Sequence, residues 1–192
     1  MEHMVEGLVV IGKLGIMASE PVGLYDDLAE HFDADQHVAE DIHGALYGNH
    51  RIEDTKKMAV VNSVMLERTQ TSLLNGISVI YDNYLNKQPI RQTVLDLATT
   101  LGALVILVHT RTKMAVIKER VRIRYAHDYL YVPSGETTAG RQIGAAAEMA
   151  VHFKYGDNPD RGNIPHFCVD GLLPCEAVIP LLDEYIAGRR AS

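Results

Sequence analysis

The sequence predicts an α/β fold, a three-layer α/β/α sandwich with a five-stranded parallel sheet in the middle. Two patterns predict it: short apolar runs, typical of strands buried on both faces, alternate with longer segments that carry apolar residues at helical spacing. Strands joined by helices in this way pair in parallel and are covered on both sides. The length of 192 residues and the hydrophobic share of 47% suit one compact domain. We therefore expect residues 1–192 to form a single domain.

Five short runs are the expected strands. The first, residues 7–12, is a continuous apolar run that ends at a glycine, and residues 103–108 form the most apolar segment of the chain. The complete set is 7–12, 37–39, 77–81, 103–108 and 167–169. Continuous rather than alternating apolar runs indicate strands that are covered on both faces.

The segments between these strands predict helices. Pro21 suits the first turn of a helix, and Leu24, Leu28 and Phe32 follow it at helical spacing. Gly76 directly follows another periodic segment, where a glycine commonly ends a helix. The expected helices are 21–32, 40–47, 55–75, 90–101, 112–127, 139–151 and 175–188.

Composition excludes several classes of protein. The longest strand-like apolar run is far shorter than a bilayer span, and the acidic N-terminus lacks the cationic start of a secretory signal, so we expect no membrane association. The two cysteines, Cys168 and Cys175, cannot build a disulfide framework and indicate reduced thiols in a cytoplasmic protein. We expect both to be small core residues. The net charge of −7 argues against a long nucleic acid as a partner.

Charge is unevenly distributed along the chain. Residues 1–54 carry twelve acidic residues against Lys13 and Arg51, a net charge of −10, which leaves +3 for the remainder. A basic cluster follows the fourth expected strand and contains one acidic residue, Glu119. Its members are Arg111, Lys113, Lys118, Arg120, Arg122 and Arg124. A bound anion is expected near this cluster.

Residues that follow the strands are the candidates for a site, because ligands of parallel sheets bind at the C-terminal ends of the strands. In chain order these are a loop after the first strand, a carboxylate pair after the second, an aspartate after the third and the arginine-rich helix after the fourth. Phosphoryl transfer needs a cradle for the phosphates, carboxylates for metal and acceptor, and cations over the transferring group. The order of residues is therefore typical of a phosphotransfer enzyme.

A family resemblance rests on three segments: residues 8–12, residues 40–48 and residues 74–85, where Gly76-Ile77-Ser78-Val79-Ile80 leads to Asp82. From about residue 7 to 170 the chain resembles the P-loop kinases of the zeta-toxin and polynucleotide-kinase type. The resemblance implies a P-loop NTPase architecture of the nucleoside-kinase-like kind. It also implies ATP and Mg²⁺ as cofactors, a lid-like segment at about 120–145, and transfer of phosphate to a hydroxyl of a small molecule or nucleotide.

The resemblance implies a role for each candidate residue. Glu40 or Asp41 would accept the proton of the acceptor hydroxyl, and Asp82 would help to place Mg²⁺. Arg120 and Arg124 would stabilise the transferring phosphoryl group. The phosphate-binding residues would be Gly12, Lys13, Gly15 and Ser19.

Residues 12–21 depart from the family pattern. The family's G-x-x-x-x-G-K-[ST] cradle wraps phosphates with backbone N–H groups and a lysine, and this stretch contains no Gly-Lys-Ser/Thr. Lys13 comes too early, Ser19 has no lysine before it, and Glu20 places a negative charge where a phosphate would lie. His43 stands where the family has an arginine, and a neutral imidazole cannot replace its fork of donors.

Three functions remain open on the sequence. The first is an ATP-dependent kinase with an altered cradle. The second is a kinase-fold protein that has lost ATP binding, needs no cofactor and acts as a binding or regulatory module with a protein partner. The third is a protein that binds another anion or nucleotide at the arginine cluster. No spacing among the nine histidines indicates a metal site. We expect His109, at the end of a strand, to be a residue at the rim of the sheet rather than a metal ligand.

Overall fold

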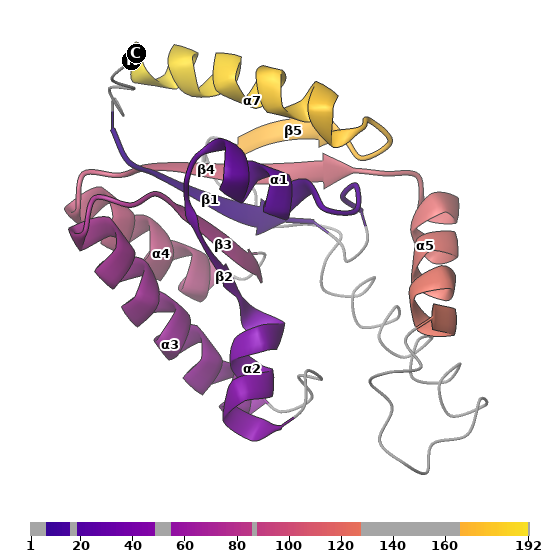
Figure 1. Cartoon of the computed structure of the whole chain (residues 1–192), viewed down its shortest axis with the longest axis horizontal. Coiled ribbons are helices and arrows are strands. Elements are labelled where there is room, and N and C mark those ends of the chain that lie inside the picture. Colours follow the sequence, from indigo (N-terminus) through magenta and orange to yellow (C-terminus); the bar gives the residue numbers. More distant parts are fainter. Residues whose placement is uncertain (1–6, 16–18, 49–54, 86–87, 128–165, 192) are drawn as a thin grey trace.

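The computed structural model describes residues 7–15, 19–48, 55–85, 88–127 and 166–191, and Figure 1 shows their arrangement. The expected helix at 139–151, and most of the lid-like segment at about 120–145, lie outside these residues. Within the described part of the chain, no helix is long and apolar enough to cross a membrane.

One five-stranded sheet runs through the middle of the molecule. Its strands pair in parallel in the order β2-β3-β1-β4-β5, so the chain's first strand is the central one. The strands are β1 (Val9–Leu14), β2 (Asp35–Val38), β3 (Val79–Tyr84), β4 (Leu104–Arg111) and β5 (His166–Asp170). The predicted five-stranded parallel sheet is thus confirmed.

Helices cover both faces of the sheet (Figure 1). The helices are α1 (Leu24–His31), α2 (Ala39–Tyr47), α3 (Thr55–Leu74), α4 (Gln88–Thr100), α5 (Met114–His127) and α7 (Cys175–Arg190). Helices α1 and α7 pack with one set of strand side chains, such as Ile11 and Val108. Helices α3 and α4, with part of α2, pack with the opposite set, such as Val10 and Leu107. The result is the predicted α/β/α sandwich.

Three strands extend further at their C-terminal ends than the apolar runs predict. Strand β1 continues through Lys13 and Leu14, β3 includes Asp82 and Tyr84, and β4 reaches Arg111. The pairing of β1 with β3 changes register between Gly12, which lies opposite Tyr81, and Lys13, which lies opposite Tyr84. Such irregularities re-aim side chains next to functional sites, and this one lies beside Lys13.

Candidate active site at the C-terminal edge of the sheet

Lys13 is the centre of a buried charge cluster. Its ammonium group lies 3.2 Å from the Glu20 carboxylate and forms a second ion pair with Asp82. The three side chains are only 12–15% exposed. The rings of Tyr25 and Tyr84 flank the same ammonium group, with their centroids 4.5 Å and 5.2 Å from Nζ. The cluster therefore joins β1, β3, the segment before α1 and α1 itself.

The carboxylates keep Lys13 charged in spite of its burial. Burial alone lowers the pKa of the Lys13 ammonium, but the nearby charges and hydrogen bonds of Glu20 and Asp82 outweigh it and raise that pKa above its usual value. Burial, followed by the negative charges of Glu20 and Asp82, raises the pKa of the Tyr25 hydroxyl well above its usual value. Both groups therefore keep their protons at neutral pH.

Three donors converge on the carboxylate of Glu20. The Lys13 ammonium and the Tyr84 hydroxyl donate to Oε1 at 3.2 Å and 3.3 Å, and the Ser19 hydroxyl donates to Oε2 at 3.3 Å. Tyr25 adds a buried hydroxyl that has no hydrogen-bond partner among the described residues. An ammonium group with several hydroxyls is a donor set for an anion, and Glu20 supplies that anion from within the chain.

Asp82 is held from two sides. One carboxylate oxygen pairs with Lys13, and the other accepts a hydrogen bond from the Gln36 amide at 3.3 Å. The same amide donates to Asp26 at 2.9 Å, which links α1 to β2 and β3. The sequence predicts Asp82 just after the third strand, but it lies within β3, opposite Val38 of β2.

Glu40 and Asp41 are the two candidates for the catalytic base. Both are exposed and lie in the first turn of α2. Burial, and then the charges of nearby groups including Glu20, Glu40 and Asp82, raises the pKa of the Tyr84 hydroxyl well above its usual value. Glu40 is therefore among the charges that act on the Tyr84 hydroxyl.

The two predicted cradle glycines have different surroundings. Gly12 lies inside strand β1 rather than in a loop. An added Cβ at Gly12 would come within 2.6 Å of a Leu85 methyl group, so this position is closely packed. The assignment of Gly12 to the phosphate cradle stays a prediction. Gly15 has a φ of +116°, a conformation that favours glycine, and begins the turn out of β1 beside His109.

Arg120 binds the backbone of the segment that contains Ser19. Its guanidinium donates to the carbonyls of Ser19 and Glu20 at 3.0 Å and 3.1 Å, and to the carbonyl of Gly171 at 2.8 Å. Thr112 adds a hydrogen bond of 2.6 Å to the Ser19 carbonyl. These bonds connect α5 and the end of β5 to the predicted cradle. The predicted contact of Arg120 with a phosphate stays a prediction, and the Arg124 side chain lies outside the described residues.

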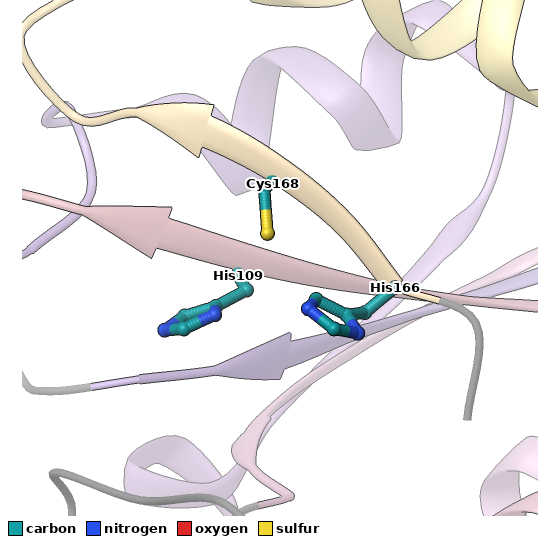
Figure 2. A group of neighbouring side chains, drawn as sticks. All are labelled: His109, His166 and Cys168. Carbon is teal, nitrogen blue, oxygen red and sulfur yellow. The ribbon is translucent and has the colours of Figure 1, made fainter. Parts of the chain in front are cut away.

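Sequence reasoning missed several residues of the site. Tyr25, Gln36 and Tyr84 carry no motif. The parallel pairing of β1, β2 and β3 brings Tyr84 and Gln36 to Lys13 and Asp82, and the packing of α1 on the sheet brings Tyr25 to Lys13. A second group was missed for the same reason: His109, His166 and Cys168 lie together on β4 and β5 (Figure 2).

Two expectations about these residues were wrong, and one was confirmed. His109 is buried rather than at the rim, because β4 extends past it. Cys168 is exposed rather than in the core, because it belongs to the edge strand β5. Cys175 is buried, as expected, and both cysteines are free thiols.

Residues 24–143, more than half of the chain, match a family model described as the AAA domain. The chain belongs to the AAA domain family. The match to the AAA domain begins at Leu24, after the segment that departs from the P-loop pattern. No curated protein matches this AAA domain chain.

Solved structures share the fold of this AAA domain chain over nearly its whole length. A protein from Chloroflexus aurantiacus that is named as a kinase superposes with a TM-score of 0.67 at 15% identity, covering 96% of this chain and 98% of its own. A sugar kinase from Janibacter sp. gives 0.62 at 15% identity, with coverages of 94% and 95%. A gluconokinase from Sinorhizobium meliloti gives 0.57 at 16% identity, with coverages of 91% and 87%. The fold is that of a kinase-like P-loop NTPase, as the sequence predicts.

Proposed function

We propose that this protein is an ATP-dependent phosphotransferase of the zeta-toxin and polynucleotide-kinase type, which phosphorylates a hydroxyl of a small molecule or nucleotide. The observation that carries the proposal is the set of donors around Glu20. Lys13, Tyr84 and Ser19 all donate to one carboxylate at the C-terminal end of β1, where P-loop proteins bind phosphate. A phosphate oxygen needs the same donors as a carboxylate oxygen.

Glu20 acts in this proposal as an internal substitute for the phosphate. Together with Asp82, its charge neutralises the buried Lys13 ammonium in the absence of nucleotide. Nucleotide binding then requires Glu20 to leave the donors, which weakens the apparent affinity for ATP by the free energy of that exchange. The negative charges of Asp26 and Asp27 in the first turn of α1 also weaken the affinity for ATP.

The chain's own residues have distinct roles in this proposal. Lys13, Tyr84 and Ser19 hold phosphate oxygens, with the buried Tyr25 hydroxyl as a further donor. ATP with Mg²⁺ supplies the phosphoryl group, and the Asp82 carboxylate is an oxygen ligand of the kind that Mg²⁺ prefers. Glu40 or Asp41, both in the first turn of α2, accepts the proton of the acceptor hydroxyl. Arg120 and Arg124 are assigned to the transferring group.

The acceptor we favour is a small polar metabolite. The acidic first quarter of the chain repels polyanions, which argues against a long nucleic acid. Two proteins with the same fold are named as a sugar kinase and a gluconokinase, so sugars and sugar acids belong first in an acceptor screen. We also propose a cytoplasmic location, a single domain over residues 1–192 and a lid-like segment at about 120–145.

The decisive experiment is a titration of the full chain with ATP and Mg²⁺ by calorimetry, comparing the wild type with Glu20→Gln. The amide keeps the size of the side chain but removes the charge that competes for Lys13, so we expect Glu20→Gln to bind ATP at least about tenfold more tightly, a gain of about 1.4 kcal/mol. Glu30→Gln is the matched control, because it makes the same change in net charge at an exposed position of α1.

Two results would contradict the proposal. If neither the wild type nor Glu20→Gln binds ATP at millimolar concentration, the donors do not form a phosphate site, and a binding module with a protein partner becomes the better explanation. If Glu30→Gln tightens binding as much as Glu20→Gln, the gain comes from net charge alone. A second substitution, Lys13→Met in the Glu20→Gln background, is expected to remove the binding, with circular dichroism confirming that the variant is folded.

A further inference from the structure

His109, His166 and Cys168 form a compact cluster at the edge of the sheet, on neighbouring strands β4 and β5 (Figure 2). Their imidazole nitrogens and thiol sulfur all lie within 4.8 Å of one another. The two rings have their centroids 5.8 Å apart. Two imidazoles and a thiol are therefore directed at one small volume.

The pairing of the strands fixes this arrangement. His109 lies directly opposite Cys168 across the β4–β5 pair, and His166 lies opposite Leu107. Side chains two residues apart on a strand point to the same face, and so do those of directly opposed residues in a parallel pair. The backbone of two strands, rather than a flexible loop, therefore holds the three side chains on one face.

Exposure increases across the cluster. His109 is 7% exposed, His166 is half-buried and Cys168 is exposed. The cluster thus has a fixed inner ligand and an accessible outer one, which leaves a path for an ion from solvent. Cys168 also has freedom to adjust, because it belongs to an edge strand.

The donor set selects the class of ion. Imidazole and thiolate suit Zn²⁺, whereas Mg²⁺ and Ca²⁺ require oxygen ligands, which this cluster does not contain. Zinc bonds of about 2.0–2.1 Å to nitrogen and 2.3 Å to sulfur, in a tetrahedral arrangement, place the ligand atoms about 3.3–3.7 Å apart. Since the ligand atoms lie within 4.8 Å of one another, they need to approach by at most about 1.5 Å, which side-chain rotation at Cys168 and His166 can supply.

We propose that His109, His166 and Cys168 bind a Zn²⁺ ion with three protein ligands. The ion joins β5 to β4 at the edge of the sheet. It also fixes the His109 ring beside Gly15, where an added Cβ would come within 3.4 Å of the ring. The site is separate from the Lys13 cluster in its ligands and in its metal, so it stands whether or not the protein binds ATP.

The test is metal binding to the purified, metal-free full chain. Equilibrium dialysis against Zn²⁺ is expected to give one ion per chain with a dissociation constant in the micromolar range or below. Substitution with Co²⁺ is expected to give the near-ultraviolet absorption that only a thiolate ligand produces. Cys168→Ser and His166→Asn are each expected to weaken zinc binding at least tenfold, and Cys168→Ser to remove the absorption.

Matched controls separate this site from general binding to thiols and histidines. Cys175→Ser removes the chain's other thiol, and His31→Asn removes an exposed histidine of α1 that contacts Asp183. Both are expected to bind zinc as the wild type does, and zinc is expected to raise the melting temperature of each control by more than that of Cys168→Ser. The proposal is overturned if the wild type takes up no zinc, or if Cys168→Ser binds it as tightly as the wild type.

Discussion

His37 shows how a single buried residue makes stability depend on pH. It lies in β2 at 8% exposure, with Nε2 3.3 Å from the hydroxyl of Ser72. That hydroxyl donates to Asp35 at 2.6 Å, so its oxygen is available to accept from the imidazole N–H. Burial is the largest influence on His37 and lowers its pKa, although the Asp35 carboxylate acts in the opposite direction.

The lowered pKa of His37 predicts a loss of stability in mild acid. The pKa of His37 in the unfolded chain is about 6.5. Below that pH, unfolded His37 takes up a proton that folded His37 does not. Lowering the pH therefore lowers the free energy of unfolding, by up to about 1.4 kcal/mol for each unit between the two pKa values. We expect His37→Gln to lose less stability than the wild type between pH 7 and pH 5, measured by urea unfolding. His31→Gln, at an exposed site, is the control, and equal losses in wild type and His37→Gln would refute the argument.

At the residue scale, the sequence identified the charged members of the site better than their partners. Lys13, Asp82 and Glu40 could be selected as site candidates because each follows an apolar run that predicts a strand. A charged residue at such a position either faces solvent or belongs to a functional site. The pairing of Lys13 with Glu20 could not be predicted, since the position of Glu20 depends on hydrogen bonds from Thr112 and Arg120 to the carbonyls of Ser19 and Glu20. The contacts of Tyr84 depend in the same way on the register of β1 and β3.

At the scale of elements, Gly171 is the point where three segments meet. Its carbonyl accepts from Arg120 of α5, and its N–H donates to the Arg111 carbonyl at the end of β4 at 2.9 Å. An added Cβ would overlap the Ser19 carbonyl and the Thr112 hydroxyl. The absence of a side chain at Gly171 is therefore what lets the segment before α1 lie against the ends of β4 and β5.

This close approach predicts the effect of one methyl group. Gly171→Ala must push Ser19 or Thr112 away, and we expect it to lose about 1–3 kcal/mol of stability, as overpacked positions do. Gly188→Ala is the matched control, because no atom of the described residues outside its own helix backbone lies within 4 Å of its Cβ position in α7, and it should gain about 0.5–1 kcal/mol. Both values come from urea unfolding, and a Gly171→Ala variant as stable as the wild type would disprove the close approach.

The elements that the structure describes could be predicted to within a few residues, with one systematic difference. Apolar runs mark only the buried part of a strand, whereas β3 and β4 continue to pair through polar residues such as Asp82 and Arg111. The extension occurs at the C-terminal ends, where neighbouring strands still offer backbone partners. Residues predicted to follow the strands, His109 among them, therefore belong to the strands and point where the pleat directs them.

At the scale of the whole molecule, the fold class follows from local patterns but the strand order does not. Periodicity within each segment was enough to predict parallel strands between helix layers. The order β2-β3-β1-β4-β5 depends on contacts between distant segments, and so does the meeting of His109 with Cys168. The family resemblance implied the architecture that the structure confirms. The contacts of residues 12–21, the segment that departs from the family pattern, were the hardest to predict.

The sheet divides the core into two halves, which predicts how the halves share stability. Val178 of α7 belongs to the half on one face and Val94 of α4 to the half on the other, and both are fully buried. Each valine-to-alanine substitution removes two methyl groups and should cost about 2 kcal/mol. The double variant should lose the sum to within about 0.5 kcal/mol, because the two valines belong to separate core clusters on opposite faces of the sheet. Since both halves pack on the same strands, we expect circular dichroism and tyrosine fluorescence to report one common urea transition in all three variants. Separate transitions would show that the faces unfold independently and that the chain is not one cooperative domain.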